Sequence, residues 1–123
     1  MSKPLLILIA GPYRSGTGDD ATLLDANLAR LEQAAWPIFQ AGHLPMIGEW
    51  VALPVMRGAG WTGVSDDVAA GVLYPTAERL LEHCDAVLRL PGASSGADND
   101  VRLARQRGLP VFFDVADIPP RVA

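Results

Sequence analysis

The stretch AVLRLPGASSGADNDVRLARQRGLPVFF, residues 86–113, decides the fold of this chain. It begins with an apolar segment, Ala86–Leu90, which predicts a buried strand. A loop of small residues follows, and apolar residues then recur at helical spacing until Gly108, a typical helix stop. Leu109–Phe113 predicts the next strand. A strand, a helix and a second strand in this order predict a right-handed crossover between parallel strands.

The N-terminal part of the chain repeats this alternation. Leu5–Ala10 is continuously apolar, as expected of a strand that is covered on both faces. Apolar residues then recur at spacings of three and four and predict a helix, in which Pro37 is expected to cause a kink or an early end. These apolar residues are Leu24, Leu28, Leu31, Ala35 and Ile38. His43–Ile47 predicts a second strand, and its proline is typical of a sheet edge.

Strands and helices therefore alternate along the chain. This pattern predicts an α/β fold in a single domain, residues 1–123. The expected architecture is a Rossmann-like three-layer sandwich with a four- to five-stranded parallel sheet. In such sheets, ligands bind beyond the carboxyl ends of the strands, at the point where the strand order reverses.

The segment Gly48–Gly71 shows no clear period and is expected to be an irregular loop. A loop of this length is usually functional or covers a partner surface. Glu49 and Trp50 are candidates to reach over a ligand. Alternatively, Trp50 and Trp61 anchor a subunit interface, because tryptophan is enriched in such interfaces. The next helix is expected to begin near Tyr74.

Composition places the chain among globular proteins and excludes several kinds of partner. Of its 123 residues, 50% are hydrophobic and 20% are charged, which is typical of a folded domain. The formal net charge of −4 lacks the positive footprint of a protein that binds nucleic acid. Because Cys84 is the one cysteine, an internal disulfide is excluded and a cytoplasmic location is expected. No segment is predicted to span a membrane, and no residues have the spacing of a metal site.

Two loops are expected to meet at the carboxyl edge of the sheet. Gly11–Gly18 follows the first strand, and Pro91–Asp100 follows the third. The second loop opens a helix, and the first N–H groups of a helix attract negatively charged ligands. Arg14 in the first loop is a candidate contact for a phosphate or carboxylate. Alternatively, the serine-rich start of the helix only caps it, and Asp100 complements the helix dipole.

Two polar residues lie beside or within predicted secondary-structure elements, and their roles can be predicted from these positions. His43 precedes a strand and is expected to be structural. Asn27 lies inside the first helix, where asparagine is unfavourable, so it either has a polar partner or is exposed.

Four features together resemble the nucleoside 2-deoxyribosyltransferase superfamily, in particular its branch of small bacterial and phage proteins. They are Ile9-Ala10-Gly11-Pro12-Tyr13, Ser95-Gly96-Ala97-x-x-Asp100, the pair Cys84-Asp85 before a strand, and the ending Ala104 to Gly108-Leu109-Pro110-Val111. The resemblance covers nearly the whole chain except Gly48–Gly71. It implies a flavodoxin-like sheet and cleavage of the N-glycosidic bond of a nucleoside or nucleotide.

The resemblance also implies which residues act. In the family a glutamate attacks the anomeric carbon of the sugar, as in a retaining glycosidase. The matching residue is Asp100, which is one methylene shorter. Tyr13 falls where an aromatic residue orients the sugar or the nucleophile. The expected binding residues are Gly11, Pro12, Arg14, Ser94, Ser95, Gly96 and Ala97.

Three functions follow as expectations. The first is an N-glycosidase or deoxyribosyltransferase that acts on a nucleoside or 5′-nucleotide without a metal or cofactor. The second is a non-catalytic module of the same fold that binds or senses nucleotides. The third is an interaction protein whose tryptophan-bearing segment forms an oligomer. A homo-oligomer, dimer or tetramer, is expected as the assembly.

Overall fold

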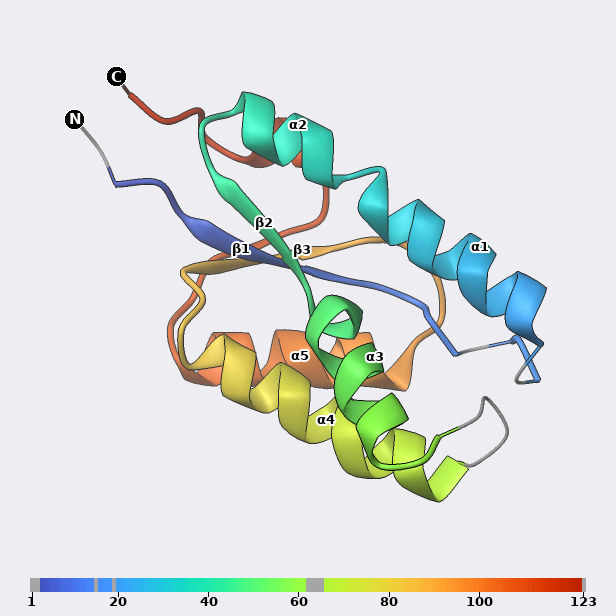
Figure 1. The fold of residues 1–123 in the computed structure, drawn as a ribbon. Coiled ribbons are helices and arrows are strands. Elements are labelled where there is room, and N and C mark those ends of the chain that lie inside the picture. Colours follow the sequence, from blue (N-terminus) through green and yellow to red (C-terminus); the bar gives the residue numbers. More distant parts are fainter. Residues whose placement is uncertain (1–2, 15, 19, 62–65, 123) are drawn as a thin grey trace.

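A computed structural model describes residues 3–14, 16–18, 20–61 and 66–122. In this part of the chain, four parallel strands form one sheet in the order β2-β1-β3-β4 (Figure 1). The strands are β1 (Leu6–Ala10), β2 (Leu44–Ile47), β3 (Ala86–Arg89) and β4 (Val111–Phe112). This order is the beginning of the flavodoxin-like order, and it reverses between β1 and β3. The predicted α/β class, the parallel sheet and the edge position of β2 are confirmed.

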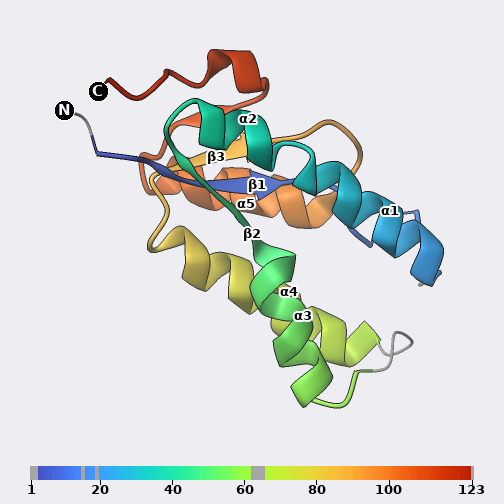
Figure 2. The same cartoon turned by 45° about the horizontal axis from the view of Figure 1, so that its top comes forward.

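Helices cover both faces of the sheet and complete a three-layer sandwich (Figures 1 and 2). Helices α1 and α2 lie on one face, α4 and α5 lie on the other, and α3 packs against α4. The helices are α1 (Ala21–Glu32), α2 (Ala35–Gln40), α3 (Gly48–Gly58), α4 (Asp66–Leu81) and α5 (Ser95–Gln106). A short 3₁₀ helix, η1 (Val115–Asp117), follows β4.

The continuous apolar run of β1 is explained by burial of both of its faces. Successive side chains of a strand point to opposite sides of the sheet. Ile7 and Ile9 pack against residues of α1 and α2, whereas Leu8 and Ala10 pack against residues of α4 and α5. Each large apolar side chain buried in this way stabilises the fold by about 1.5–3 kcal/mol. The two layers therefore hold β1 firmly and fix where its following loop begins.

The first predicted helix is divided into two. Helix α1 ends at Glu32, and α2 begins at Ala35. Pro37 has no N–H to donate, and its ring clashes with the carbonyl four residues before it, which is that of Gln33. The break therefore falls one turn before the proline.

The prediction of an irregular loop at Gly48–Gly71 is wrong. Helix α3 begins at Gly48, directly after β2, and α4 begins at Asp66. The expected helix start near Tyr74 is also wrong, because Tyr74 lies in the middle of α4. Residues 62–65 of the expected loop lie outside the described residues.

Packing between α3 and α4 explains why this segment is helical. Ala52 and Met56 are fully buried against Ala69. Each helix contains a proline, Pro54 in α3 and Pro75 in α4, which disfavours a helix in the isolated chain. Burial of the shared apolar surface outweighs that local preference, a contribution that the local sequence does not reveal.

His43 is structural, as predicted. It is 6% exposed, and its Nδ1 accepts a hydrogen bond from the N–H of Leu5 at 3.0 Å. Its Nε2 lies 2.7 Å from the carbonyl oxygen of Pro119. A backbone N–H can only donate and a carbonyl can only accept, so the hydrogen of the neutral ring lies on Nε2. His43 thus ties β1, β2 and the C-terminal segment together.

Replacing His43 with alanine is expected to lower the free energy of unfolding by about 2–3 kcal/mol, because the buried ring is removed and the partly buried N–H of Leu5 loses its acceptor. Urea denaturation of the wild type and of His43→Ala measures this difference. His83→Ala is the matched control, since His83 is exposed, and should change stability by less than about 0.5 kcal/mol. Equal effects of the two substitutions would contradict the structural role of His43.

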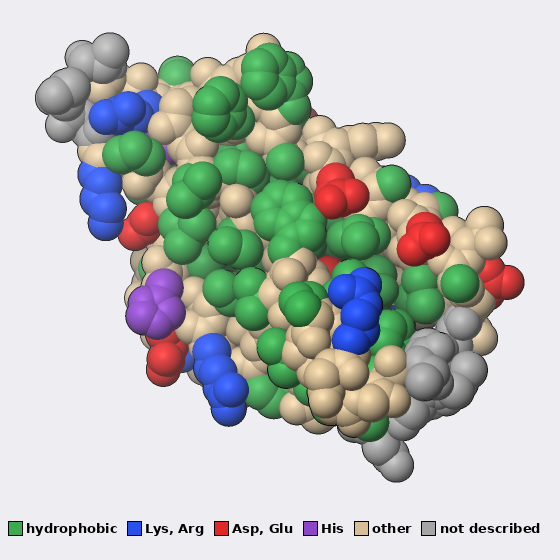
Figure 3. All heavy atoms as spheres, in the orientation of Figure 1, with side chains coloured by type: hydrophobic (Ala, Val, Ile, Leu, Met, Phe, Trp, Pro, Cys, Tyr) green, Lys and Arg blue, Asp and Glu red, His purple; other side chains and the backbone are tan. Residues whose placement is uncertain are grey.

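Large apolar side chains are exposed on the face formed by α2, β2 and α3 (Figure 3). The most exposed are Trp36, Phe39, Leu44, Val55, Val51 and Trp50. The Trp36 and Phe39 rings stack on each other with their centroids 5.9 Å apart. Trp50 donates a hydrogen bond from Nε1 to Oε2 of Glu32 at 2.9 Å, whereas Trp61 packs against the α3–α4 core. The expected homo-oligomer stays a prediction, and this face offers it an apolar surface.

Candidate functional site

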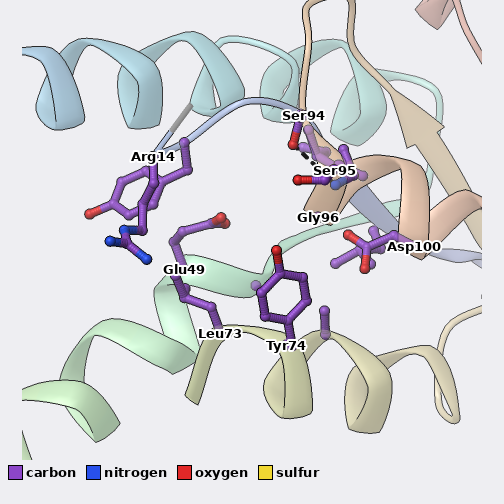
Figure 4. A pocket seen from close by; sticks show the side chains of 16 residues that line it. Arg14, Glu49, Leu73, Tyr74, Ser94, Ser95, Gly96 and Asp100 are labelled. Atoms are coloured by element: carbon purple, nitrogen blue, oxygen red, sulfur yellow. Dashed lines mark hydrogen bonds between the residues drawn. The ribbon is translucent and has the colours of Figure 1, made fainter. Parts of the chain in front are cut away.

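A cavity of about 300 Å³ lies beyond the carboxyl ends of β1, β2 and β3. Three segments that each follow a strand contribute to its wall, and α4 supplies the remaining side (Figure 4). The lining residues are Leu8, Ile9, Ala10, Gly11, Tyr13, Arg14, Gly48, Glu49, Leu73, Tyr74, Ala77, Ser94, Ser95, Gly96, Ala97 and Asp100. Ligands of flavodoxin-like sheets bind at this edge, at the point where the strand order reverses.

The first loop is held by a residue of α1. Asn27 is 9% exposed, and its Nδ2 donates a hydrogen bond of 2.7 Å to the carbonyl oxygen of Tyr13. Asn27 Oδ1 in turn accepts from Nη1 of Arg30 at 2.9 Å. These bonds satisfy the asparagine that disfavours the helix, so the polar-partner interpretation is confirmed. They also fix Tyr13, which is 7% exposed, at the wall of the cavity.

The second loop is held by Arg89, at the end of β3. Its guanidinium donates to the carbonyl oxygens of Leu90 and Gly92, and its Nη2 lies 2.9 Å from Oδ1 of Asp98 in α5. Arg89 is 9% exposed. The sequence could have predicted this role, because Arg89 is a basic residue at the end of an otherwise apolar strand. Charged side chains are seldom buried without partners.

The two loops touch each other, as predicted from the fold. Gly92 has a φ of 118°, and a Cβ at this position would lie 2.7 Å from Cγ of Pro12. Both the backbone conformation and the close approach require glycine here. Pro12 therefore packs between the loops, and it is the one expected site residue that does not line the cavity.

The start of α5 is both a capped helix end and a wall of the cavity. Ser94 is the cap: its Oγ accepts a hydrogen bond from the N–H of Ala97 at 3.1 Å (Figure 4). Within the described residues, the N–H groups of Ser95 and Gly96 have no acceptor. The capping interpretation thus holds for Ser94, and two N–H groups remain available to a ligand.

Asp100 projects from the second turn of α5 into the cavity (Figure 4). Burial raises the pKa of its carboxyl group from 3.8 to about 7. The nearby charge of Glu49 acts in the same direction, and the Arg89 guanidinium opposes both. A carboxyl group with so high a pKa exchanges a proton near neutral pH, which is typical of a catalytic group.

Glu49 is the second carboxyl group of the cavity. It lies in the first turn of α3 and enters from the side opposite Asp100 (Figure 4). Burial raises its pKa as well. The sequence marked Glu49 only as a residue that could reach over a ligand. Its pairing with Asp100 depends on β2 and β3 lying on either side of β1.

Helix α4 supplies the apolar side of the cavity, which the sequence did not predict. Leu73, Tyr74 and Ala77 line it at helical spacing. The Tyr74 ring lies beside the start of α5, since a Cβ at Gly96 would be 3.8 Å from Cε1 of Tyr74. The cavity thus combines an apolar wall with polar groups from three strand ends, an arrangement typical of small-molecule sites.

The pKa of Tyr13 responds to the charge of Glu49 and not to that of Asp100. Burial, followed by the charges of Glu49 and Asp25, raises the pKa of the Tyr13 phenol above its usual value. Among the described residues, no hydrogen bond joins Tyr13 to Asp100. The predicted orienting role of Tyr13 stays a prediction, and Glu49 is the cavity carboxyl group whose charge acts on the phenol.

Cys84 and Asp85 stabilise the fold and do not line the cavity. Burial raises the pKa of the Cys84 thiol to about 11, so the thiol is neutral in the core. Asp85 Oδ2 accepts a hydrogen bond from the N–H of Leu6 at 2.8 Å and thereby fixes the start of β1 beside β3.

Two searches of the described residues were negative. No group of three or more His, Cys, Asp or Glu side chains there is arranged to hold a metal ion. No helix in the same part of the chain has the length and apolar character needed to cross a membrane.

The fold and the cavity define this protein as a Rossmann-like α/β protein with two facing carboxyl groups at the point where the strand order reverses. No protein-family model matches the chain, and a search of the curated proteins gave no match. The functional argument therefore depends on the chemistry of the cavity.

Proposed function

We propose that this protein cleaves or transfers the N-glycosidic bond of a nucleoside or 5′-nucleotide, with Asp100 as the nucleophile. The observation that carries the proposal is the partly buried Asp100 carboxyl group, which faces a second carboxyl group across a cavity of about 300 Å³. A carboxylate that stabilises an oxocarbenium-like transition state and then bonds to the anomeric carbon is the central device of retaining glycosidases. The resemblance to nucleoside 2-deoxyribosyltransferases supports the same role for Asp100.

The shape and polarity of the cavity support a nucleoside as the substrate. Leu73, Tyr74 and Ala77 form an apolar wall against which a flat base can pack. The opposite wall is polar and begins at the free N–H groups of Ser95 and Gly96. These groups suit an anionic or hydroxyl-bearing part of the ligand, namely a 5′-phosphate or the sugar.

Arg14 gives the polar side a positive charge. It lines the cavity from the first loop, across from the start of α5 (Figure 4). A guanidinium group and a helix N-terminus on the same cavity favour a ligand with a negative charge. This arrangement favours a 5′-nucleotide over the uncharged nucleoside.

The alternative function is a non-catalytic nucleotide-binding module, and one observation favours it. With a pKa of about 7, Asp100 is only partly ionised at neutral pH, and a neutral carboxyl group is not a nucleophile. A binding protein would use the same group as a hydrogen-bond donor to the ligand.

The test is release of free base from a panel of ribo- and deoxyribonucleosides and their 5′-monophosphates, followed by trapping of the intermediate. A 2′-fluoro-arabino analogue of the cleaved substrate slows hydrolysis of the glycosyl-enzyme ester, because fluorine disfavours positive charge at the anomeric carbon. Peptide mass spectrometry is expected to find the sugar bonded to Asp100.

Two outcomes would count against the enzyme. Absence of base release, together with saturable thermal stabilisation by a nucleotide, would support the binding module. A trapped sugar on any residue other than Asp100 would keep the reaction and remove the proposed nucleophile.

A further inference from the structure

We propose that Glu49 is the acid that protonates the departing base and, in the second half of the reaction, the base that activates water or an acceptor. This inference rests on the proposed N-glycosidic cleavage and completes it. Among the site residues that the resemblance implies, Asp100 is the one carboxylic acid, so they include no acid for the leaving base. Departure of an unprotonated purine or pyrimidine is difficult, so the reaction needs such a group.

The sheet order brings Glu49 to the required position. Glu49 follows β2, Asp100 follows β3, and the two strands flank β1. Both side chains line the same cavity and enter it from opposite sides (Figure 4). A substrate in this cavity therefore lies between the two carboxyl groups, which is the arrangement that retaining cleavage requires.

Glu49 is held in the first turn of α3, where a hydrogen bond from its own backbone to the carboxylate partly opposes the effect of burial on its pKa. Ile47 precedes α3 and provides no side-chain cap, and Glu49 is the acidic residue of the first turn. Next to it, Trp50 points to the protein surface, where it bonds to Glu32. Adjacent residues of α3 thus have different roles, and Glu49 is the one that lines the cavity.

The reaction balances with these two groups and water. As the bond between C1′ and the base nitrogen breaks, its electron pair goes to the nitrogen, which takes the proton from Glu49. An oxygen of Asp100 forms the new bond to C1′. A water molecule then attacks C1′ and gives its proton to Glu49, while the bond between C1′ and Asp100 breaks and its electron pair returns to the carboxylate. The products are the free base and the sugar, and both carboxyl groups regain their initial states.

The charges around the pair are compatible with one shared proton. Burial raises the pKa of both groups, and the charge of Glu49 adds to the shift at Asp100. Two carboxyl groups that interact in this way titrate as a pair, and one proton is retained over an intermediate pH range. Arg89 and Glu78 also act on the charge of Asp100, and Tyr13 and Arg14 line the same cavity. Asp25 and Arg57 act on Tyr13.

The test compares two substrates that differ only in whether the base needs a proton to leave. The guanine of guanosine needs a proton to leave, whereas the base of 7-methylguanosine already carries a positive charge. Both compounds are made with the sugar and the 5′ substituent of the substrate that the wild type accepts. At pH 6, the first turnover of Glu49→Gln, which precedes the attack of water, is expected to release guanine about 10²-fold or more slowly than the wild type, and 7-methylguanine within about 5-fold of the wild-type rate. If the wild type releases only pyrimidines, cytidine and 3-methylcytidine, which is cationic at pH 6, form the corresponding pair.

The controls separate this inference from the proposed function. Asp100→Asn should lose cleavage of both substrates, because a nucleophile is needed for either base. Glu82→Gln removes an exposed carboxylate directly after α4 that neither lines the cavity nor acts on Asp100, and should keep both activities.

Equal losses on both substrates in the first turnover of Glu49→Gln would overturn the role of Glu49 as the acid and leave the proposed reaction standing. A wild-type protein that releases no base from any substrate would overturn the proposed function, and the role of Glu49 with it.

Discussion

Asp100→Asn is expected to raise the free energy of unfolding by about 4 kcal/mol at pH 8, and by less than half of that at pH 5. The reason is the burial of an ionisable group whose pKa is raised from 3.8 to about 7 in the folded protein. The folded protein binds more protons than the unfolded chain between these two values. Stability is therefore lost as the pH rises through about 7, and asparagine, which cannot ionise, does not lose it.

Urea denaturation at the two pH values measures this effect. Asp98→Asn is the matched control, since Asp98 lies on the same helix and its side chain is 72% exposed. Asparagine keeps the Oδ1 acceptor for the buried Arg89 guanidinium, so the substitution should cost no more than about 1 kcal/mol and should give no gain at pH 8. A variant Asp100→Asn that is no more stable than the wild type at pH 8 would contradict the burial of an ionised carboxylate.

The same substitution is expected to lower the rate of base release by about 10³-fold or more. Asparagine has nearly the shape of aspartate but does not form the ester with C1′, so the first step of the proposed reaction is lost. Steady-state release of free base measures the loss. Isothermal titration with the 5′-nucleotide should still detect binding, because Arg14 and the start of α5 are unchanged.

Opposite effects on stability and activity from one substitution are the expected mark of a functional carboxyl group. A residue retained for packing alone would be improved by asparagine without a loss of activity. If Asp100→Asn keeps full activity and gains stability, Asp100 is not the nucleophile, and the binding-module alternative gains support.

Much of the candidate site was predictable because it lies at strand ends. Tyr13, Arg14 and Asp100 follow apolar segments that the sequence marks clearly, and parallel strands place such segments at one edge of the sheet. Ser94 shows the limit of this reasoning. Its position predicts both a cap and a binding residue, and in the structure the hydroxyl oxygen accepts the capping hydrogen bond while the residue lines the cavity.

The remaining half of the site was hidden by a wrong prediction about Gly48–Gly71. Prolines and glycines in this segment argue locally against helices. The buried contact between Met56 and Ala69 makes α3 and α4 stable together. Because α4 carries Tyr74, the error concealed the apolar wall of the cavity as well as the position of Glu49.

The sequence by itself determined the layers, the direction of the strands and the two loops that meet at β1 and β3. These features depend on hydrophobic periodicity and on turn residues, which act over a few neighbouring positions. Only the tertiary structure decided that Glu49 faces Asp100 and that both carboxyl groups are partly buried. The two residues are distant in the chain, and their electrostatic interaction depends on the order of three strands and on the packing of α3 against α4. Burial and charge proximity are properties of that arrangement, and they raise the pKa of Asp100 to about 7.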